Sequence, residues 1–185
     1  MPFDEVTSEM RSAAKAVNFG IVYGISDFGL ARQLGISRKE AARYIELYFM
    51  RYPGVHTYLK GCVERAKQQG AATTLFGRRR EMPELKSSNY NTRSFGERVA
   101  MNMPIQGTAA DIIKLAMVRV HNELKARGMK SELILQIHDE LIIDAVQEEA
   151  DAAAEILKSC MENVVNLKVP LLAEVHTGHS WFDTK

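Results

Sequence analysis

Four side chains spaced four residues apart, Arg11, Lys15, Phe19 and Tyr23, are the best placed in this sequence to bind a ligand together. Each helical residue turns the chain by about 100°, so a step of four drifts by only about 40° and keeps all four on nearly one face. The row begins with two cations, which bind phosphate oxygens, and ends with two rings, on which a flat base can stack. It therefore predicts a site for a ligand with phosphates at one end and a base at the other.

The same spacing also fits an ordinary amphipathic helix with two solvated cations and two core rings. Gly20 and Gly24 favour the ligand, because glycine is a poor residue inside a helix and its missing side chain lets a large group approach. We expect this helix over residues 8–24.

A second candidate site is His138-Asp139-Glu140, which lies between the apolar runs 133–137 and 141–143. This pattern predicts a β-hairpin with a polar tip. Two adjacent carboxylates favour a divalent cation, which prefers oxygen ligands. Because neighbouring strand residues point to opposite faces, Asp139 is expected to contact the metal directly and Glu140 to act behind it or through water. The alternative is an acidic turn in contact with solvent alone, and His138 could bind metal, a phosphate or a hydroxyl.

The remaining patterns predict a mostly helical chain around these two sites. In the first half of the chain, further helices are expected at 30–34, at 37–51 with a Ser37–Glu40 capping box, and after Pro53-Gly54 as far as Gln69. In the second half, a helix capped by Thr92 or Ser94 should end before Pro104. Another should run from an N-cap at Thr108 to Gly128, and a last one is expected at 148–167. Strands are expected at 72–76, 133–137, 141–143 and 170–175, and an exposed loop at 83–91.

Composition limits the class of protein. With 185 residues and 46% hydrophobic residues, the chain is one domain or a large piece of one. No apolar run approaches the roughly 20 residues of a membrane span, and no secretory signal is recognisable, so we expect a cytoplasmic protein with Cys62 and Cys160 reduced. The net charge of +1 conceals an excess of eight positive charges over residues 1–128 and of seven negative charges over 129–185. The basic part is expected to attract a polyanion such as nucleic acid.

Four segments, taken together, resemble the family A DNA polymerases. The row on the first helix, within Arg11–Gly24, resembles the fingers motif of that family, and His138-Asp139-Glu140 resembles its third palm motif. Thr74–Arg80 and Arg98–Asp111 are also similar to family segments. The four occur in the family's order and cover nearly the whole chain. The resemblance therefore implies a C-terminal fragment, with the fingers and part of the palm, of a bacterial family member.

The resemblance implies roles for the residues of the row. Arg11 and Lys15 would hold the triphosphate of the incoming nucleotide, and Lys15 would also protonate the leaving pyrophosphate. Phe19 would pack against the sugar and base, and a phenylalanine here implies discrimination against dideoxynucleotides. Tyr23, with Gly24 beside it, would stack at the templating position of the DNA.

The resemblance also implies contacts with the DNA duplex. Arg98, Asn102 and Gln106 would reach the minor groove, where the acceptors of A·T and T·A pairs are equivalent, so that pair shape rather than sequence is tested. His138 would lie near the primer terminus. Arg93, on the same helix as Arg98, is a weaker candidate for DNA binding.

The implied fold is α+β, with a mainly helical fingers subdomain packed on a partial antiparallel-sheet palm that carries the acidic-tipped hairpin. Residues 1–70 would be the fingers helices, 71–93 a short hairpin and loop, and 94–185 the partial palm. The implied activity is DNA-templated DNA synthesis, in which a nucleotide passes from a dNTP to a primer 3′-OH. Two Mg²⁺ ions about 3.5–4 Å apart would serve this reaction, held in part by Asp139 and Glu140. The implied partners are primer–template DNA and deoxynucleoside triphosphates, with no membrane.

One family segment has no match in this sequence. The first palm motif, which carries another metal-binding aspartate, would precede the fingers helix, so we expect the fragment to be inactive alone. The alternative is a module that binds DNA without catalysing a reaction. In the family the hairpin would pair with the strand that bears this motif. Without that strand the hairpin would have an open apolar edge or face, which predicts self-association of the truncated fragment.

Overall fold

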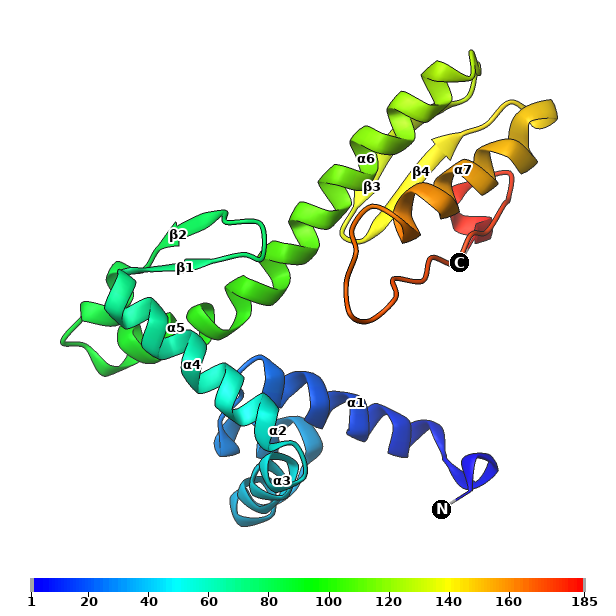
Figure 1. Ribbon diagram of the computed structural model, residues 1–185. Helices are drawn as coiled ribbons and strands as arrows, with labels where there is room; N and C mark the ends of the chain where they lie inside the picture. Colours follow the sequence, from blue (N-terminus) through cyan, green and yellow to red (C-terminus); the bar gives the residue numbers. More distant parts are fainter. Residues whose placement is uncertain (1, 185) are drawn as a thin grey trace. The chain divides into compact units, whose positions relative to one another are not determined.

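The computed structural model describes residues 2–184, which form two compact units, one ending at Gly107 and the other beginning at Thr108. Each unit contains several helices and one two-stranded antiparallel sheet (Figure 1). The predicted α+β class is confirmed. No helix in the described part of the chain combines the length and apolar character needed to cross a membrane.

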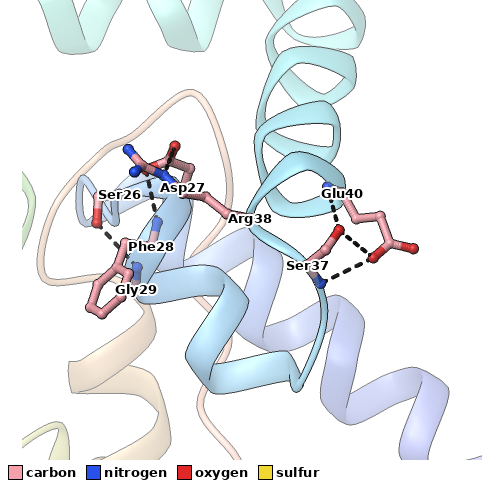
Figure 2. A network of polar contacts seen from close by, with 7 residues as sticks. All are labelled: Ser26, Asp27, Phe28, Gly29, Ser37, Arg38 and Glu40. Carbon is pink, nitrogen blue, oxygen red and sulfur yellow. Dashed lines mark hydrogen bonds and ion pairs between the residues drawn. The ribbon is translucent and has the colours of Figure 1, made fainter.

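The first unit begins with helices whose ends match local sequence signals. They are α1 (Ser8–Val22), α2 (Asp27–Leu34), α3 (Arg38–Arg51) and α4 (Pro53–Gln69). The predicted capping box is confirmed: Ser37 Oγ accepts from the Glu40 N–H, and the Glu40 carboxylate accepts from the Ser37 N–H (Figure 2). Arg38 Nε donates to Asp27 Oδ2 at 2.6 Å, and this bond lowers the pKa of Asp27. Gly70 ends α4 in the left-handed conformation, as expected.

The rest of the first unit departs from the sequence prediction in three places. It consists of β1 (Ala71–Thr73), β2 (Arg79–Glu81), the 3₁₀-helix η2 (Pro83–Lys86), α5 (Tyr90–Asn102) and a π-helical turn, η3 (Met103–Gly107). The strand expected at 72–76 is shorter, and the expected loop at 83–91 contains η2 and the start of α5. Asn89, rather than Thr92 or Ser94, caps α5, because its side chain accepts from the backbone N–H groups of Asn91 and Thr92. The core of this unit contains Ala66, Ala72, Met82, Leu85 and Ala100.

The second unit is a hairpin packed against two helices (Figure 1). It consists of α6 (Thr108–Ala126), β3 (Glu132–Ile137), β4 (Glu140–Asp144), η4 (Gln147–Glu149), α7 (Ala150–Glu162) and η5 (Trp181–Thr184). Its core joins Ile113, Val120 and Leu124 of α6, Leu141 of β4 and Ile156 of α7. The strands are antiparallel, with a bulge between Leu133 and Leu135 that leaves Ile134 outside the pairing.

Three predictions for the second unit are wrong. Residues 170–175 form no strand, since β3 and β4 pair only with each other within the described residues. The alternation of half-buried and exposed residues over 171–176 is that of an extended chain, but a strand also needs a neighbour. The helix expected to reach 167 ends at Glu162, where the Asn163 side chain donates to the Ser159 carbonyl. Thr108 begins α6 but does not cap it, because the π-helical turn leads directly into the helix.

The Glu149 carboxylate holds the residues just before β3 by hydrogen bonds. Glu149 accepts from the backbone N–H groups of Lys130 and Ser131 and from Ser131 Oγ, at 2.6–3.2 Å. The Ser131 hydroxyl is the first cause that lowers the pKa of Glu149, and the two backbone donors add to it. A carboxyl whose pKa is lower in the folded state stabilises the fold above its unfolded pKa, and this contribution is lost as the pH falls through the folded value.

We therefore expect the melting temperature of the second unit to fall as the pH drops from about 5 to about 3. The Glu149→Gln variant should be less stable than the native chain at pH 7, and the difference should shrink across that range. Glu148→Gln, at the exposed neighbouring position, serves as the control in thermal unfolding followed by circular dichroism. A gap between Glu149→Gln and the native chain that is constant with pH would contradict this account.

Candidate functional site

The four residues of the predicted row lie along one helix. Arg11, Lys15 and Phe19 belong to α1, and Tyr23 is its C-cap residue. The rings of Phe19 and Tyr23 stack with centroids 6.2 Å apart and an interplanar angle of 24°. Lys15 Nζ lies 6.0 Å from the centroid of the Phe19 ring, within reach of a cation–π contact. Phe19 is 47% exposed, so it is not a core residue of this unit.

Contacts on the other sides of α1 leave the row facing outward. Ile21, nearly opposite the row, is 2% exposed. Tyr48 of α3 donates its hydroxyl hydrogen to Asn18 Oδ1 at 2.8 Å. Thr7 caps the helix by accepting from the Met10 N–H. Helix α1 is thus packed on its opposite side, while Arg11, Lys15 and Phe19 are exposed and Tyr23 is half-buried.

The two glycines near the row are explained by contacts within the chain. Gly24 has a φ of +74°, and a Cβ there would overlap Met101 and lie 3.1 Å from Arg98 Cγ. This glycine therefore allows the chain just after α1 to lie against α5, with Gly24 beside Arg98. A Cβ at Gly20 would lie 3.0 Å from the Ile25 side chain. A bound ligand is not needed to account for either glycine.

Three of the residues predicted to bind DNA follow one another along α5 and the π-helical turn. Arg98 is exposed and donates to Ser94 Oγ at 3.1 Å, and Gln106 is exposed on the turn. Asn102 Oδ1 is buried and has no hydrogen-bond partner among the described residues. Buried acceptors are normally satisfied, and π-helical turns often occur at functional sites. The unmet acceptor and the turn together mark this surface as a candidate site.

The Arg93 side chain makes a hydrogen bond and a ring contact within the first unit. Its Nη1 donates to the Ser87 carbonyl at 3.0 Å, and its guanidinium carbon lies 5.8 Å from the centroid of the Tyr90 ring. The side chain is half-buried. These contacts fasten the loop before α5 and leave Arg93 less available for a ligand than Arg98.

The predicted hairpin tip is a two-residue turn. Ile137 pairs with Glu140, so His138 and Asp139 form the connection and Glu140 is the first residue of β4. His138 has a φ of +52° and is the one non-glycine residue in the described chain with a positive φ. This conformation costs about 1–2 kcal/mol for an L-residue. The Gln136 side chain helps to hold it by donating to the His138 carbonyl at 2.8 Å. Backbone strain that persists in this way is typical of functional sites.

Residues 138–140, called the acidic turn below, are accessible, but they do not make a complete metal site. His138, Asp139 and Glu140 are all exposed. Their carboxylate oxygens have the donor chemistry that Mg²⁺ prefers. Within residues 2–184, however, no group of three or more His, Cys, Asp or Glu side chains could hold a metal ion. The two acids can supply part of a site at most, and further ligands would have to come from elsewhere.

Contacts with the turn also come from the last described residues. Glu140 Oε2 accepts a hydrogen bond from Trp181 Nε1 at 3.2 Å. Sequence reasoning missed this contact, since it joins residues 41 positions apart and no local pattern indicates it. It missed the role of Glu149 for the same reason.

Comparisons with known proteins agree on one family. The profile of DNA polymerase family A matches residues 1–183. The chain is 58% identical to DNA polymerase I of Caldicellulosiruptor bescii over 181 residues and 54% identical to that of Bacillus caldotenax over 182 residues. In both cases 98% of this chain and 21% of the relative are covered, so the chain spans about one fifth of the length of these relatives.

A solved structure also resembles the whole chain. It is the POL domain of Pol1 from M. smegmatis, in complex with DNA primer-template and dNTP. The sequence identity is 44%, the TM-score is 0.95, and the match covers 100% of this chain and 32% of the other.

Proposed function

Because this chain belongs to DNA polymerase family A, we propose that it supplies the nucleotide-binding helix and the acidic turn of an enzyme that carries out DNA-templated DNA synthesis. The reaction transfers a nucleotide from a dNTP to a primer 3′-OH. The observation that carries this proposal is the outward row of two cations and two stacked rings on α1. The M. smegmatis relative, with primer-template and dNTP bound, supports the choice of ligands.

The row on α1 binds the incoming nucleotide. Arg11 and Lys15 hold the triphosphate through charge-assisted hydrogen bonds, and Lys15 is the proton donor to the leaving pyrophosphate. Phe19 packs against the sugar and base, and Tyr23 stacks at the templating position next to Gly24.

The surface formed by α5 and the π-helical turn reads the DNA minor groove. Arg98 and Gln106 are exposed donors, and the groove offers acceptors whose positions do not depend on pair orientation. Asn102 is the third DNA-binding residue of this proposal, and because its Oδ1 is buried, the side chain has to turn outward to meet a donor on the DNA. Arg93 contributes less, and His138 lies near the primer terminus. In this proposal residues 1–70 are fingers helices, 71–93 a hairpin and loop, and 94–185 part of the palm.

The acidic turn contributes carboxylate oxygens for Mg²⁺. Asp139 is the direct ligand and Glu140 the supporting one, with the remaining ligands outside the described residues. Two such ions, when bound, polarise the reacting oxygens of a phosphoryl transfer. Asp139, at the exposed tip of a strained turn, is held where its oxygens can face a ligand.

A second candidate function is DNA binding without catalysis by this chain alone. The excess of eight positive charges over residues 1–128 favours it, because basic surfaces bind the phosphate backbone of DNA whether or not a reaction follows.

The chain also self-associates in this proposal, through an open strand edge of the β3–β4 hairpin. Sedimentation as a monomer at high concentration would exclude self-association.

A chimeric enzyme distinguishes DNA synthesis from DNA binding without catalysis. This chain replaces the matching 181 residues of the C. bescii DNA polymerase I, which is 58% identical over that stretch. We expect the chimera to extend a primer with the nucleotides that the template specifies. A folded chimera that binds DNA but adds no nucleotide would favour the binding module, and the unsubstituted C. bescii enzyme is the control.

A further inference from the structure

Residues 178–184 form a small structure that reaches the acidic turn. Ser180 Oγ donates to Asp183 Oδ2 at 2.6 Å, and the Asp183 N–H donates to the Ser180 carbonyl at 3.0 Å. Thr184 Oγ1 donates to the Trp181 carbonyl at 2.8 Å. These bonds close the 3₁₀-helical turn η5 around Trp181.

A glycine allows this turn to form. A Cβ at Gly178 would lie 2.8 Å from Asp183 Cβ and 3.2 Å from the Asp183 carbonyl carbon. The first of these distances is shorter than real Cβ contacts, so a side chain at position 178 would force Gly178 or Asp183 to shift. The segment therefore has a defined shape that fixes where the indole points.

The indole of Trp181 is directed at the acidic turn. Its Nε1–H donates to Glu140 Oε2 at 3.2 Å, and the Trp181 side chain is only 38% exposed, whereas the neighbouring Phe182 is 85% exposed. A hydrogen bond to a carboxylate is stronger than one between neutral groups. Glu140 directly follows Asp139 and is the first residue of β4, so a bond to its carboxylate also limits the movement of the turn.

We propose that Trp181 is a positioning residue, whose indole N–H holds the Glu140 carboxylate and thereby orients the His138–Asp139 turn. The effect of this positioning on nucleotide transfer rests on the proposed function, whereas the contact itself does not. Residues 178–184 therefore belong to the site through this contact.

The contact can be tested in the 185-residue chain, because Trp181 is its one tryptophan and gives a single indole N–H signal in a ¹H–¹⁵N spectrum. Glu140→Ala should move that signal, and Asp139→Ala, the matched control on the same turn, should leave it nearly in place. An indole signal that Glu140→Ala does not move would overturn the proposal.

The positioning role is tested by removing the donor while keeping a ring. Trp181→Phe should shift or broaden the amide signals of residues 138–140, and Phe182→Leu should leave them unchanged. Amide signals of the turn that are identical in Trp181→Phe and the native chain would refute positioning.

The catalytic consequence is measured in the chimeric polymerase. Trp181→Phe should lower kcat on the order of 10-fold, the effect of losing one hydrogen bond to a charged group, with KM for the dNTP unchanged. An unchanged kcat, with the indole contact present in the spectra, would also refute positioning. A native chimera without activity would count against the proposed function instead, and the spectra would still decide whether Trp181 orients the turn.

Discussion

Replacing Asp139 with asparagine is expected to lower kcat of the chimeric polymerase by about 10³-fold or more, with little change in its affinity for primer–template DNA. Asparagine keeps the shape of the side chain but removes the negative charge that a divalent cation requires. Electrostatic groups aimed at the reacting atoms commonly contribute effects of about 10²–10³-fold each, and a direct metal ligand is expected at or above the upper end. Single-turnover nucleotide addition measures the loss.

Asp144→Asn provides the matched control for this prediction. Asp144 is an exposed acid at the far end of β4, where it pairs with Glu132. The same change of charge there should leave the rate within about twofold of the native chimera, since the charge is removed from the same hairpin but not from its tip. Equal losses in both variants would indicate that the overall negative charge of the hairpin matters, and not a specific ligand at the turn.

Replacing Lys15 with alanine is expected to lower kcat/KM for the incoming dNTP by about 10²–10³-fold. The ammonium group is the second cation of the row, between Arg11 and the stacked rings, where it would contact the phosphates and donate a proton to the leaving group. Loss of a contact made in both ground and transition states raises KM, whereas loss of the proton donor lowers kcat. Rapid-quench measurements over a range of dNTP concentrations separate the two effects.

Lys39→Ala, at an exposed position on α3, is the control for the loss of a positive charge. It should change kcat/KM by less than about twofold, because exposed charges beyond a Debye length of about 10 Å are largely screened. A wild-type value of kcat/KM in Lys15→Ala would remove the row on α1 from the mechanism.

Local signals in the sequence predicted most of the helices of the first unit. The Ser37–Glu40 box, Pro53 at the start of α4 and Gly70 after its end each act within a few residues, and each lies where expected. The i, i+4 spacing likewise placed Lys15 and Phe19 on one face. Such features depend on backbone geometry that a short segment determines by itself.

Features that depend on distant neighbours were not predictable in the same way. The 170–175 segment has the alternation of a strand, but no described strand lies beside it to pair with. Gly24 was interpreted as room for a ligand, and it proved to make room for Met101. The bond from Trp181 to Glu140 depends on a fold that brings together residues far apart in the sequence. A single sequence contains no direct record of such contacts.

Photo-crosslinking shows which segment of the chain lies against the base of the bound nucleotide. The chimeric polymerase, bound to a primer–template with thymine at the templating position, is irradiated with 8-azido-dATP, and the labelled peptide is identified by mass spectrometry. We expect the label on the segment Phe19–Tyr23, and excess dATP should prevent it. A dATP-sensitive label found only outside α1 and its C-cap would show that the row on α1 does not bind the nucleotide.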